Sequence, residues 1–130
     1  IIKIKQRYPG HAKQAALIAS QCRPGAYLGR YVIVVDDDID IYNPDDVIWA
    51  MSTRSEPENI DIIRRAWSGP LDPVIPRERK GFNSRAIIDA TRPFEWRDKF
   101  PAANAVSDEF KDQLDKKYAS VLKEILQRAH

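Results

Sequence analysis

The hydrophobic pattern along the chain switches between the period of a strand and the period of a helix. Ile2 and Ile4 alternate with polar residues near the start, which predicts a strand, and the unbroken β-branched run over 31–35 predicts a buried one. Between them, small apolar residues recur every three or four positions from His11 to Cys22, which predicts a closely packed helix. Strands that alternate with helices in this way are typical of an α/β domain.

The clearest helix start in the chain follows the buried run. The Asn43 side chain can cap a helix, and Pro44 suits the first helical position because its φ is already close to the helical value. Asp45 and Asp46 would then lie at the positive end of the helix dipole. We therefore predict a helix from Pro44 to Arg54. The acidic turn before it is a candidate site, because ligands of α/β folds often bind beyond the carboxyl ends of strands.

The remaining elements and the core follow from the same patterns. Residues 59–66 and 86–90 predict two further strands, and Arg23-Pro24-Gly25 is expected to stop the first helix. Three groups of apolar side chains are expected to face the core. They are Ala15, Ile18, Ala19 and Cys22 in the first helix, Val47, Ile48 and Met51 in the second, and Ile60, Ile62 and Ile63 in the strand that follows.

Two segments of the second half invite a functional interpretation. Residues 68–84 predict a long irregular loop interrupted by proline and glycine, with a charged tip at 77–80. Ser107 is expected to cap a terminal helix over about 107–129, whose apolar stripe would serve equally for docking onto its own domain or onto a neighbouring subunit. The stripe comprises Phe110, Leu114, Tyr118, Val121, Leu122 and Ile125.

Composition narrows the class of protein. The 130 residues suit one domain, and a formal net charge of only +2 gives no reason to expect nucleic acid or a membrane surface as partner. The single cysteine, Cys22, excludes an internal disulfide and favours a reduced, cytoplasmic setting. A strand pattern that begins at the first residue, which is not methionine, indicates a fragment of a longer protein.

The acidic run from Asp36 to Asp40 has two interpretations. Carboxylates suit hard divalent cations, and paired aspartates at a strand end are found at the metal sites of some transferases. Four carboxylates so close in sequence cannot all face one ion, however. We favour the structural interpretation, in which they cap the following helix and close the turn.

Other chemically active side chains are more simply explained by structure. His11 has no partner residue nearby in sequence, and a packing or capping histidine is favoured over a general acid or base. Cys22 is expected to be a buried, inert thiol. Glu95 and Arg97 are expected to be solvated. No phosphate-binding glycine loop, zinc site or nucleophile elbow is present in the sequence.

Five stretches taken together resemble the C-terminal domain of the UbiD family of decarboxylases. They occur in the family's order and spacing and span most of the chain. They are IKQRYPGHAKQ at 4–14, YVIVVDDDID at 31–40, DVIWAMSTR at 46–54, SGPLDP at 68–73 and SRAIIDATRP at 84–93. Within the family, the chain looks most like the bacterial enzymes that act on hydroxybenzoic and related acids.

The resemblance implies reversible, non-oxidative decarboxylation of aromatic or unsaturated carboxylic acids. Prenylated FMN, held with Mn²⁺ and K⁺, would carry the chemistry. The family's catalytic Glu-Arg-Glu residues, metal ligands and most flavin contacts lie upstream of the matched region, so no catalytic or metal residue is assigned here, and we expect the isolated chain to hold no cofactor. Leu71 matches a leucine that approaches the substrate side of the flavin. Tyr27 is the nearest match to a cofactor-contacting tyrosine, although Pro24 stands where those members have lysine.

The sequence thus predicts an α/β domain, with a small mixed sheet flanked by helices and a long C-terminal helix, that spans residues 1–130. Its expected partners are the N-terminal and flavin-binding domains of the same enzyme, further subunits of a homo-oligomer, and the acid substrate. Closure of the domain would complete the pocket. The alternatives are a stand-alone docking module without catalysis and a metal-dependent transferase that uses Asp36 and Asp38.

Overall fold

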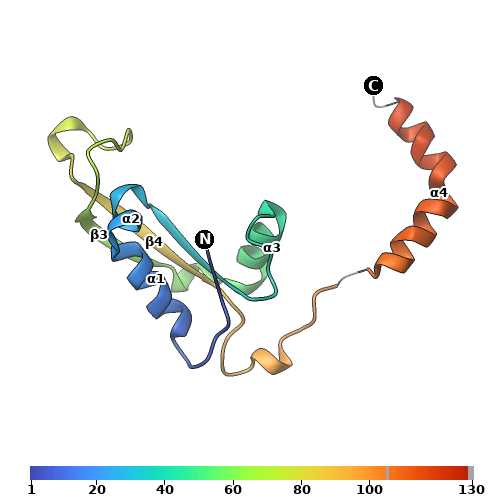
Figure 1. Ribbon diagram of the computed structural model, residues 1–130, viewed down its shortest axis with the longest axis horizontal. Coiled ribbons are helices and arrows are strands. Elements are labelled where there is room, and N and C mark those ends of the chain that lie inside the picture. The colour runs from blue at the N-terminus through green and yellow to red at the C-terminus, as the bar shows by residue number, and fades with distance from the viewer. Residues whose placement is uncertain (105, 129–130) are drawn as a thin grey trace. The chain divides into compact units, whose positions relative to one another are not determined.

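The structure is a computed structural model. It describes residues 1–104 and 106–128, and all their side chains except those of Leu28, Ser120, Leu122 and 124–128. The chain divides after Phe100 into two units (Figure 1). The helices and strands of the first unit are β1 (Ile2–Ile4), α1 (His11–Gln21), α2 (Arg23–Leu28), β2 (Tyr31–Asp36), α3 (Pro44–Arg54), β3 (Asp61–Trp67) and β4 (Phe82–Ala90). The same unit has three short 3-10 turns, η1 (Pro57–Asn59), η2 (Arg77–Arg79) and η3 (Arg97–Lys99). The second unit contains α4 (Asp108–Arg128).

The first unit is built on one mixed sheet of four strands in the order β1-β2-β4-β3. β1, β2 and β4 run parallel, and β3 pairs antiparallel with β4 at one edge. Helices α1 and α3 cover opposite faces of this sheet (Figure 1). The predicted α/β class, the mixed sheet and the terminal helix are therefore confirmed.

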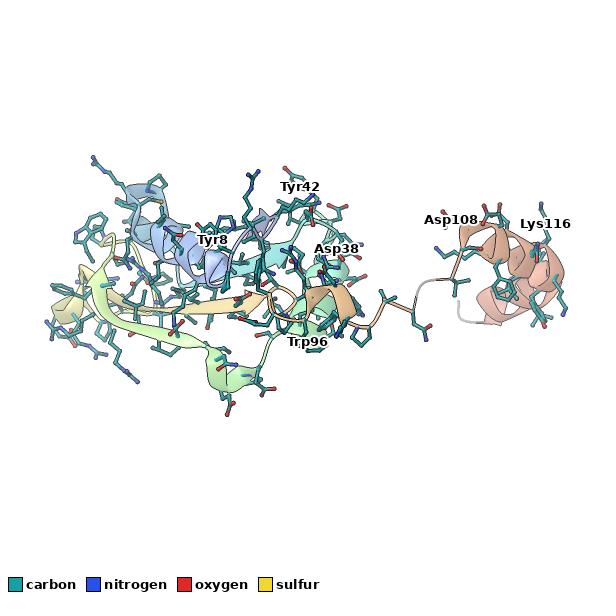
Figure 2. All side chains as sticks on the ribbon, turned by 90° about the horizontal axis from the view of Figure 1, so that it is seen from below. Tyr8, Asp38, Tyr42, Trp96, Asp108 and Lys116 are labelled. Carbon is teal, nitrogen blue, oxygen red and sulfur yellow. The ribbon has the colours of Figure 1, made fainter. Side chains whose placement is uncertain are left out.

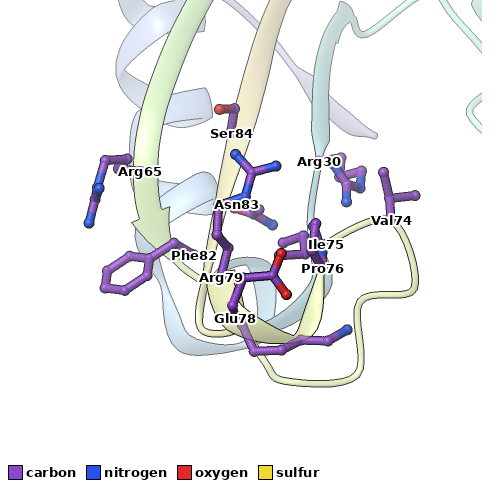
Figure 3. A pocket seen from close by; sticks show the side chains of 11 residues that line it. Arg30, Arg65, Val74, Ile75, Pro76, Glu78, Arg79, Phe82, Asn83 and Ser84 are labelled. Atoms are coloured by element: carbon purple, nitrogen blue, oxygen red, sulfur yellow. The ribbon is translucent and has the colours of Figure 1, made fainter.

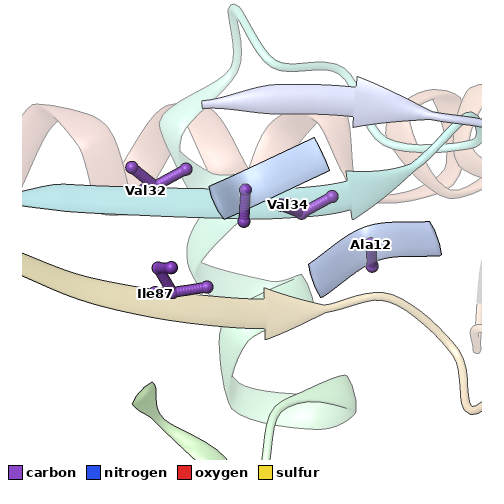
Figure 4. Close-up of a cluster of buried hydrophobic side chains, with 5 residues drawn as sticks. Ala12, Val32, Val34 and Ile87 are labelled. Carbon is purple, nitrogen blue, oxygen red and sulfur yellow. The ribbon is translucent and has the colours of Figure 1, made fainter. Parts of the chain in front are cut away.

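The core beneath α1 is made from small helical residues and β-branched strand residues. Ala12 and Ala16 lie against Val32 and Val34 of β2 and Ile87 of β4 (Figure 4). Alanine brings the helix backbone close to the sheet, so the β-branched side chains fill the interface without a cavity. Ile2 and Ile4 pack at the margin of this cluster, as their alternation predicted.

The core beneath α3 uses the other face of the same strands. Val35 and Ala90 pack with Val47 and Ala50 of the helix, and Ile39 of the acidic turn closes the cluster. Alternation along β2 directs Val34 to α1 and Val35 to α3, so both are fully buried.

The start of α3 follows the sequence prediction. The Asn43 side chain accepts a hydrogen bond from the Asp45 backbone N–H at 3.1 Å, and Pro44 occupies the first turn. The helix also ends at Arg54, as expected.

The predicted buried face of α1 is partly wrong. Ala12, Ala16 and Ser20 are the buried residues of this helix, whereas Ile18 is 63 % exposed and Cys22 is also exposed. Positions four apart form one stripe on a helix, and here the stripe of small residues faces the sheet because only small residues permit this close approach. Cys22 is displaced further because Arg23-Pro24-Gly25 begins α2 as well as ending α1.

Three other expectations near the sheet require correction. Ile48 is 60 % exposed and Ile62 is 47 % exposed, because α3 packs on β4 and leaves the edge strand β3 uncovered on that face. Strand β4 begins at Phe82 rather than at Ala86, so the irregular loop ends at Gly81.

Asp36 joins the ends of three strands and one helix. Its carboxylate accepts hydrogen bonds from Gln6 after β1 (3.1 Å), Arg54 of α3 (3.0 Å), and the backbone N–H and Nε of Arg92 after β4 (2.7 and 3.2 Å). Arg54 also forms two 2.8 Å bonds to Asp38, and these hydrogen bonds lower the pKa of the Asp38 carboxyl. The acidic run therefore has a structural role, as favoured, but the expected capping is wrong: Asp36 and Asp38 hold arginines, and Asn43 caps α3.

The Arg54 side chain is itself buried, with 4 % of it exposed. Its guanidinium lies over the rings of Trp49 and Phe100, and Phe100 in turn contacts Trp96. Asp38 and Trp96 consequently lie at the same end of the first unit (Figure 2). The network is thus a buried ion pair between Asp36 and Arg54, with aromatic rings packed against the guanidinium group.

Removal of the Asp36 carboxylate tests this network. In the Asp36→Ala variant, Arg54 loses one of its two anionic partners inside the protein, and we expect the free energy of unfolding to fall by about 3 kcal/mol, as is typical of a broken buried ion pair. Urea unfolding followed by circular dichroism measures it. Asp37→Ala is the matched control, because Asp37 is exposed and should change stability by no more than about 0.5 kcal/mol. Equal losses in the two variants would contradict the assigned role of Asp36.

Candidate functional site

The segment between β3 and β4 is a loop with a firmly attached base. The Ser68 N–H donates to the Gly81 carbonyl at 2.9 Å, which closes the loop where it leaves the sheet. The Gly69 N–H donates to the Tyr27 carbonyl at 2.6 Å, and the Ser68 hydroxyl donates to the same carbonyl at 3.3 Å. Asn83 adds a 3.1 Å bond to the Ser68 hydroxyl. These bonds attach the start of the loop to the end of α2.

Gly69 is required where the loop meets Tyr27. A Cβ atom at this position would lie 2.9 Å from both the Tyr27 ring and the Tyr27 carbonyl oxygen. Any larger residue would therefore push the loop away and lengthen the backbone hydrogen bond. The two site residues expected from the resemblance, Tyr27 and Leu71, are brought to neighbouring segments by this close approach.

A second attachment lies further along the loop. Both carboxylate oxygens of Asp72 accept 2.6 Å bonds from Arg30, and Asp72 is only 2 % exposed. The Val74 N–H also donates to this carboxylate at 3.1 Å, and the Lys80 ammonium group donates to the Asp72 backbone carbonyl. Arg30 is the main cause of a lowered pKa at Asp72, so the ion pair is fully formed at neutral pH.

Between these attachments, Pro70 and Leu71 of the loop face outward. Leu71 is 72 % exposed and Tyr27 is 40 % exposed, and the Tyr27 ring lies 5.9 Å from that of Trp67, which is also exposed. Apolar side chains held at a surface by buried polar bonds form a rigid wall that another surface could cover.

Arg85 supports the loop from beneath and was not identified from the sequence. It is 1 % exposed, and its guanidinium donates to the backbone carbonyls of Ser20, Ala26 and Trp67. Burial lowers the pKa of Arg85, but a guanidinium stays charged at neutral pH. The Ser20 and Ala26 carbonyls belong to the last turns of α1 and α2, where the negative ends of the helix dipoles stabilise a cation.

The other candidate residues have structural roles. His11 accepts a hydrogen bond from the Arg7 N–H at 3.3 Å and stacks on Tyr8, as its structural interpretation predicts. The expectation that Arg97 is solvated is only partly correct: 35 % of its side chain is exposed, but it donates to the Gln6 carbonyl at 2.8 Å and lies over the Phe94 ring. Glu95 is exposed as expected.

The part of the chain that the structure describes does not provide a metal site. Within residues 1–104 and 106–128, no three or more His, Cys, Asp or Glu side chains converge in a way that could hold an ion. Asp36 and Asp38 instead face Arg54. Likewise, no described helix is both long enough and apolar enough to cross a bilayer.

Comparison with known families supplies the context for this loop. Residues 1–90 match the model of the 3-octaprenyl-4-hydroxybenzoate carboxy-lyase C-terminal domain, the UbiD C-terminal domain. The chain belongs to this family. The resemblance that the five sequence stretches indicated is therefore confirmed.

Among curated proteins, the chain is similar to a phenolic acid decarboxylase from Sedimentibacter hydroxybenzoicus. The two are 38% identical over 94 residues, which cover 72% of this chain and 19% of the relative. A gallate decarboxylase from Lactiplantibacillus plantarum is 34% identical over 105 residues, with 72% of this chain and 20% of the relative covered. The chain thus spans about a fifth of the length of these UbiD-type carboxy-lyases.

Solved structures give the same result. The UbiD-class enzyme HmfF from Pelotomaculum thermopropionicum, in complex with FMN, matches with a TM-score of 0.69 and 28% identity over 80% of this chain and 22% of that one. An evolved dimeric form of HmfF in complex with prFMN matches with a TM-score of 0.54 and 26% identity over 79% of this chain and 19% of that one. Vanillic acid decarboxylase from Sedimentibacter hydroxybenzoicus matches in its open form with a TM-score of 0.69 and 32% identity, over 95% of this chain and 26% of that one. Its closed form matches with a TM-score of 0.69 and 31% identity, over 95% of this chain and 25% of that one.

The attachment of the UbiD loop through Asp72 should depend on pH in a defined direction. Because the pKa of Asp72 is lowered in the folded protein, its ion pair contributes stability above the usual value of 3.8, and that contribution is lost as the pH falls through the lowered pKa. An NMR titration of the Asp72 carboxyl carbon and the Val74 amide measures this transition. In Arg30→Gln the midpoint should rise toward 3.8, whereas Arg77→Gln, which removes an arginine outside this contact, should leave it in place. An unchanged midpoint in Arg30→Gln would show that Arg30 is not the cause.

Proposed function

We propose that this chain is the C-terminal domain of a larger, prenylated-FMN-dependent decarboxylase of aromatic or unsaturated carboxylic acids, and that its loop 68–81 forms one wall of the flavin and substrate pocket. The observation that carries the proposal is the presentation of Leu71 and Tyr27. Both are exposed, yet the backbone that holds them is fixed by the Gly69 and Asp72 contacts.

The chemistry of the wall agrees with this role. Leu71 offers only an apolar surface, and Pro70 and Pro73 restrict the backbone on either side of it. Such a surface shapes a pocket and excludes water but cannot transfer a proton. In the proposed enzyme, the flavin acts as the electron sink, and this domain contributes no catalytic group.

The metal ions of the proposed enzyme belong elsewhere. The described residues of this domain hold no suitable cluster of ligands, so we assign Mn²⁺ and K⁺ to the upstream flavin-binding domain. We assign no step of the reaction to a metal at this domain.

The open and closed forms of the related vanillic acid decarboxylase support a domain that closes. A wall that closes over a cofactor must be rigid in itself, because its geometry at the reacting atoms must be reproduced at each closure. The buried bonds of Asp72 and Arg85 provide that rigidity within the first unit.

A second role, in assembly, is favoured by α4. Ser107 caps this helix by accepting a 3.3 Å hydrogen bond from the Phe110 N–H, as predicted. Phe110, Leu114, Tyr118 and Val121 are all at least 36 % exposed, whereas Leu122 and Ile125 of the predicted stripe fall outside the described side chains. We propose that this stripe packs against another subunit of a homo-oligomer, since a row of exposed apolar side chains is typical of an interface.

The wall role of Leu71 predicts a kinetic effect in the intact enzyme. Leu71→Ala should lower kcat/KM for the acid substrate by about tenfold or change substrate preference, because an apolar contact of this size discriminates by about 10- to 200-fold. Steady-state assays of CO₂ release measure it, with flavin loading checked by absorbance. Ile18→Ala is the matched control, an exposed aliphatic residue on α1. Unchanged kinetics in Leu71→Ala would reject the assigned wall.

The assembly role of α4 predicts a change in oligomer size. Leu114→Ser with Tyr118→Ser should shift the intact enzyme to a smaller species in sedimentation, because each buried apolar side chain contributes about 1.5–3 kcal/mol to association. Lys116→Ser is the control, because this residue lies on the polar side of α4 (Figure 2). Deletion of residues 107–130 is the stronger variant. An oligomer that survives this deletion would reject the role.

A further inference from the structure

A hollow of about 510 Å³ lies beside the loop, and neither Leu71 nor Tyr27 lines it. Its lining comes from Arg30 just before β2, the bulged part of β3, the start of β4 and the later half of the loop. Figure 3 shows Arg65 and Phe82 on one side of this hollow and Arg30 and Val74 on the other. The hollow therefore lies apart from the exposed Leu71 and Tyr27 side chains, although it shares the later half of the same loop.

The hollow carries more positive than negative charge. Arg30, Arg65, Arg79 and Lys80 line it, with Glu78 as the only acidic residue of the lining. Asp72 neutralises Arg30, but in the described part of the chain no ion pair holds Arg65, Arg79 or Lys80. Uncompensated cations around a concavity concentrate the field and attract anions.

Arg65 reaches this hollow through an unusual backbone. Its φ is +53°, the left-handed region that residues with a Cβ rarely adopt, and it lies where the register between β3 and β4 shifts from Ile63 to Ala66. A bulge of this kind redirects a side chain relative to a regular strand. Here the Arg65 guanidinium lies 5.1 Å from the centre of the Phe82 ring.

The remaining lining is apolar. Val74, Ile75 and Pro76 of the loop form one part, and the half-exposed Phe82 ring forms another. A small inorganic anion would use the cations but leave this surface in contact with water. An anion with a flat apolar body would use both, because it can place its charge at the guanidinium groups and its body against the ring.

We propose that this hollow binds an organic anion with a flat apolar body, of which an aromatic carboxylate is the simplest example, through Arg65 and Arg79. The carboxylate lies at the two guanidinium groups, and the ring of the ligand packs on Phe82 and Ile75. This site shares the later half of loop 68–81 with the proposed wall but does not include Leu71 or Tyr27, and its occupation does not depend on the flavin.

The test is an NMR titration of the whole 130-residue chain with benzoate, inorganic phosphate and benzamide, followed through backbone amide signals. Benzoate should shift the signals of Arg65, Arg79 and Phe82 saturably. Phosphate lacks the ring and benzamide lacks the charge, so each should bind at least about tenfold more weakly. Phosphate binding as tightly as benzoate would establish a plain anion site and overturn the proposal, and so would equal binding of benzamide or an absence of shifts in the hollow.

Substitutions give an independent readout. Arg65→Gln and Arg79→Gln should each weaken benzoate binding by about tenfold, the factor expected for one charge-assisted hydrogen bond. Arg64→Gln and Arg77→Gln are matched controls, since each arginine is next in sequence to a lining residue but does not itself line the hollow. Unshifted signals in the rest of the spectrum show that each variant is folded. Equal affinities for benzoate in the lining variants and the control variants would overturn the proposal. This outcome is independent of the effect of Leu71→Ala on the kinetics of the intact enzyme, which tests the proposed function.

Discussion

The carboxylate of Asp36 is the group on which the arrangement of this domain depends most. It lies at the carboxyl end of β2 and holds the segments that leave β1 and β4, together with the last residue of α3, in one network. A buried carboxylate is costly unless its charge is matched and its lone pairs are used, and here Arg54, Arg92 and Gln6 meet both conditions. The acidic run therefore needs no metal to account for it: Asp36 faces inward to the arginines, Asp38 shares Arg54 from the surface, and the capping of α3 involves Asn43 and Asp46.

The opposite end of the sheet is organised by a buried cation. Arg85 binds three backbone carbonyls, two of which are at helix ends, so the dipoles of α1 and α2 compensate its charge where no carboxylate does so within the described residues. The third carbonyl, that of Trp67, ends β3 immediately before the loop. The loop therefore starts from a point fixed by a buried polar network, and the Arg30–Asp72 ion pair fixes it again five residues after Trp67. Between these two points only a few residues are free to project, and Leu71 is one of them.

The elements governed by local chemistry could be predicted from the sequence, and those that depend on distant contacts could not. β2 and α3 were predicted correctly because a β-branched run, Asn43 and Pro44 each act within a few residues. The burial of Ala12 and Ala16 in place of Ile18 depends on how closely α1 approaches the sheet. That distance cannot be inferred from the hydrophobic periodicity of the sequence alone. Arg85 and Arg97 look like ordinary surface arginines in the sequence, since most of their partners are backbone carbonyls more than fifty residues away. The proximity of Tyr27 and Leu71 depends on Gly69, because a side chain at this position would collide with Tyr27. The sequence does not show that these two residues meet.

The same use of polar contacts explains why Leu71 and Tyr27 lie on an exposed surface of the domain. The buried polar contacts at the base of the loop are directed to a carbonyl, to the Ser68 hydroxyl or to Asp72, and they hold the backbone in place. What remains to face outward at Leu71, Trp67 and Tyr27 is apolar or aromatic, and 40–72 % of each residue is exposed. A protein that leaves such side chains uncovered on a rigid support loses the free energy of their burial, unless another surface covers them for part of the working cycle. Under the proposed function, the covering surface belongs to the rest of the enzyme, and the related decarboxylases, of which this chain spans about a fifth, have the length to supply it.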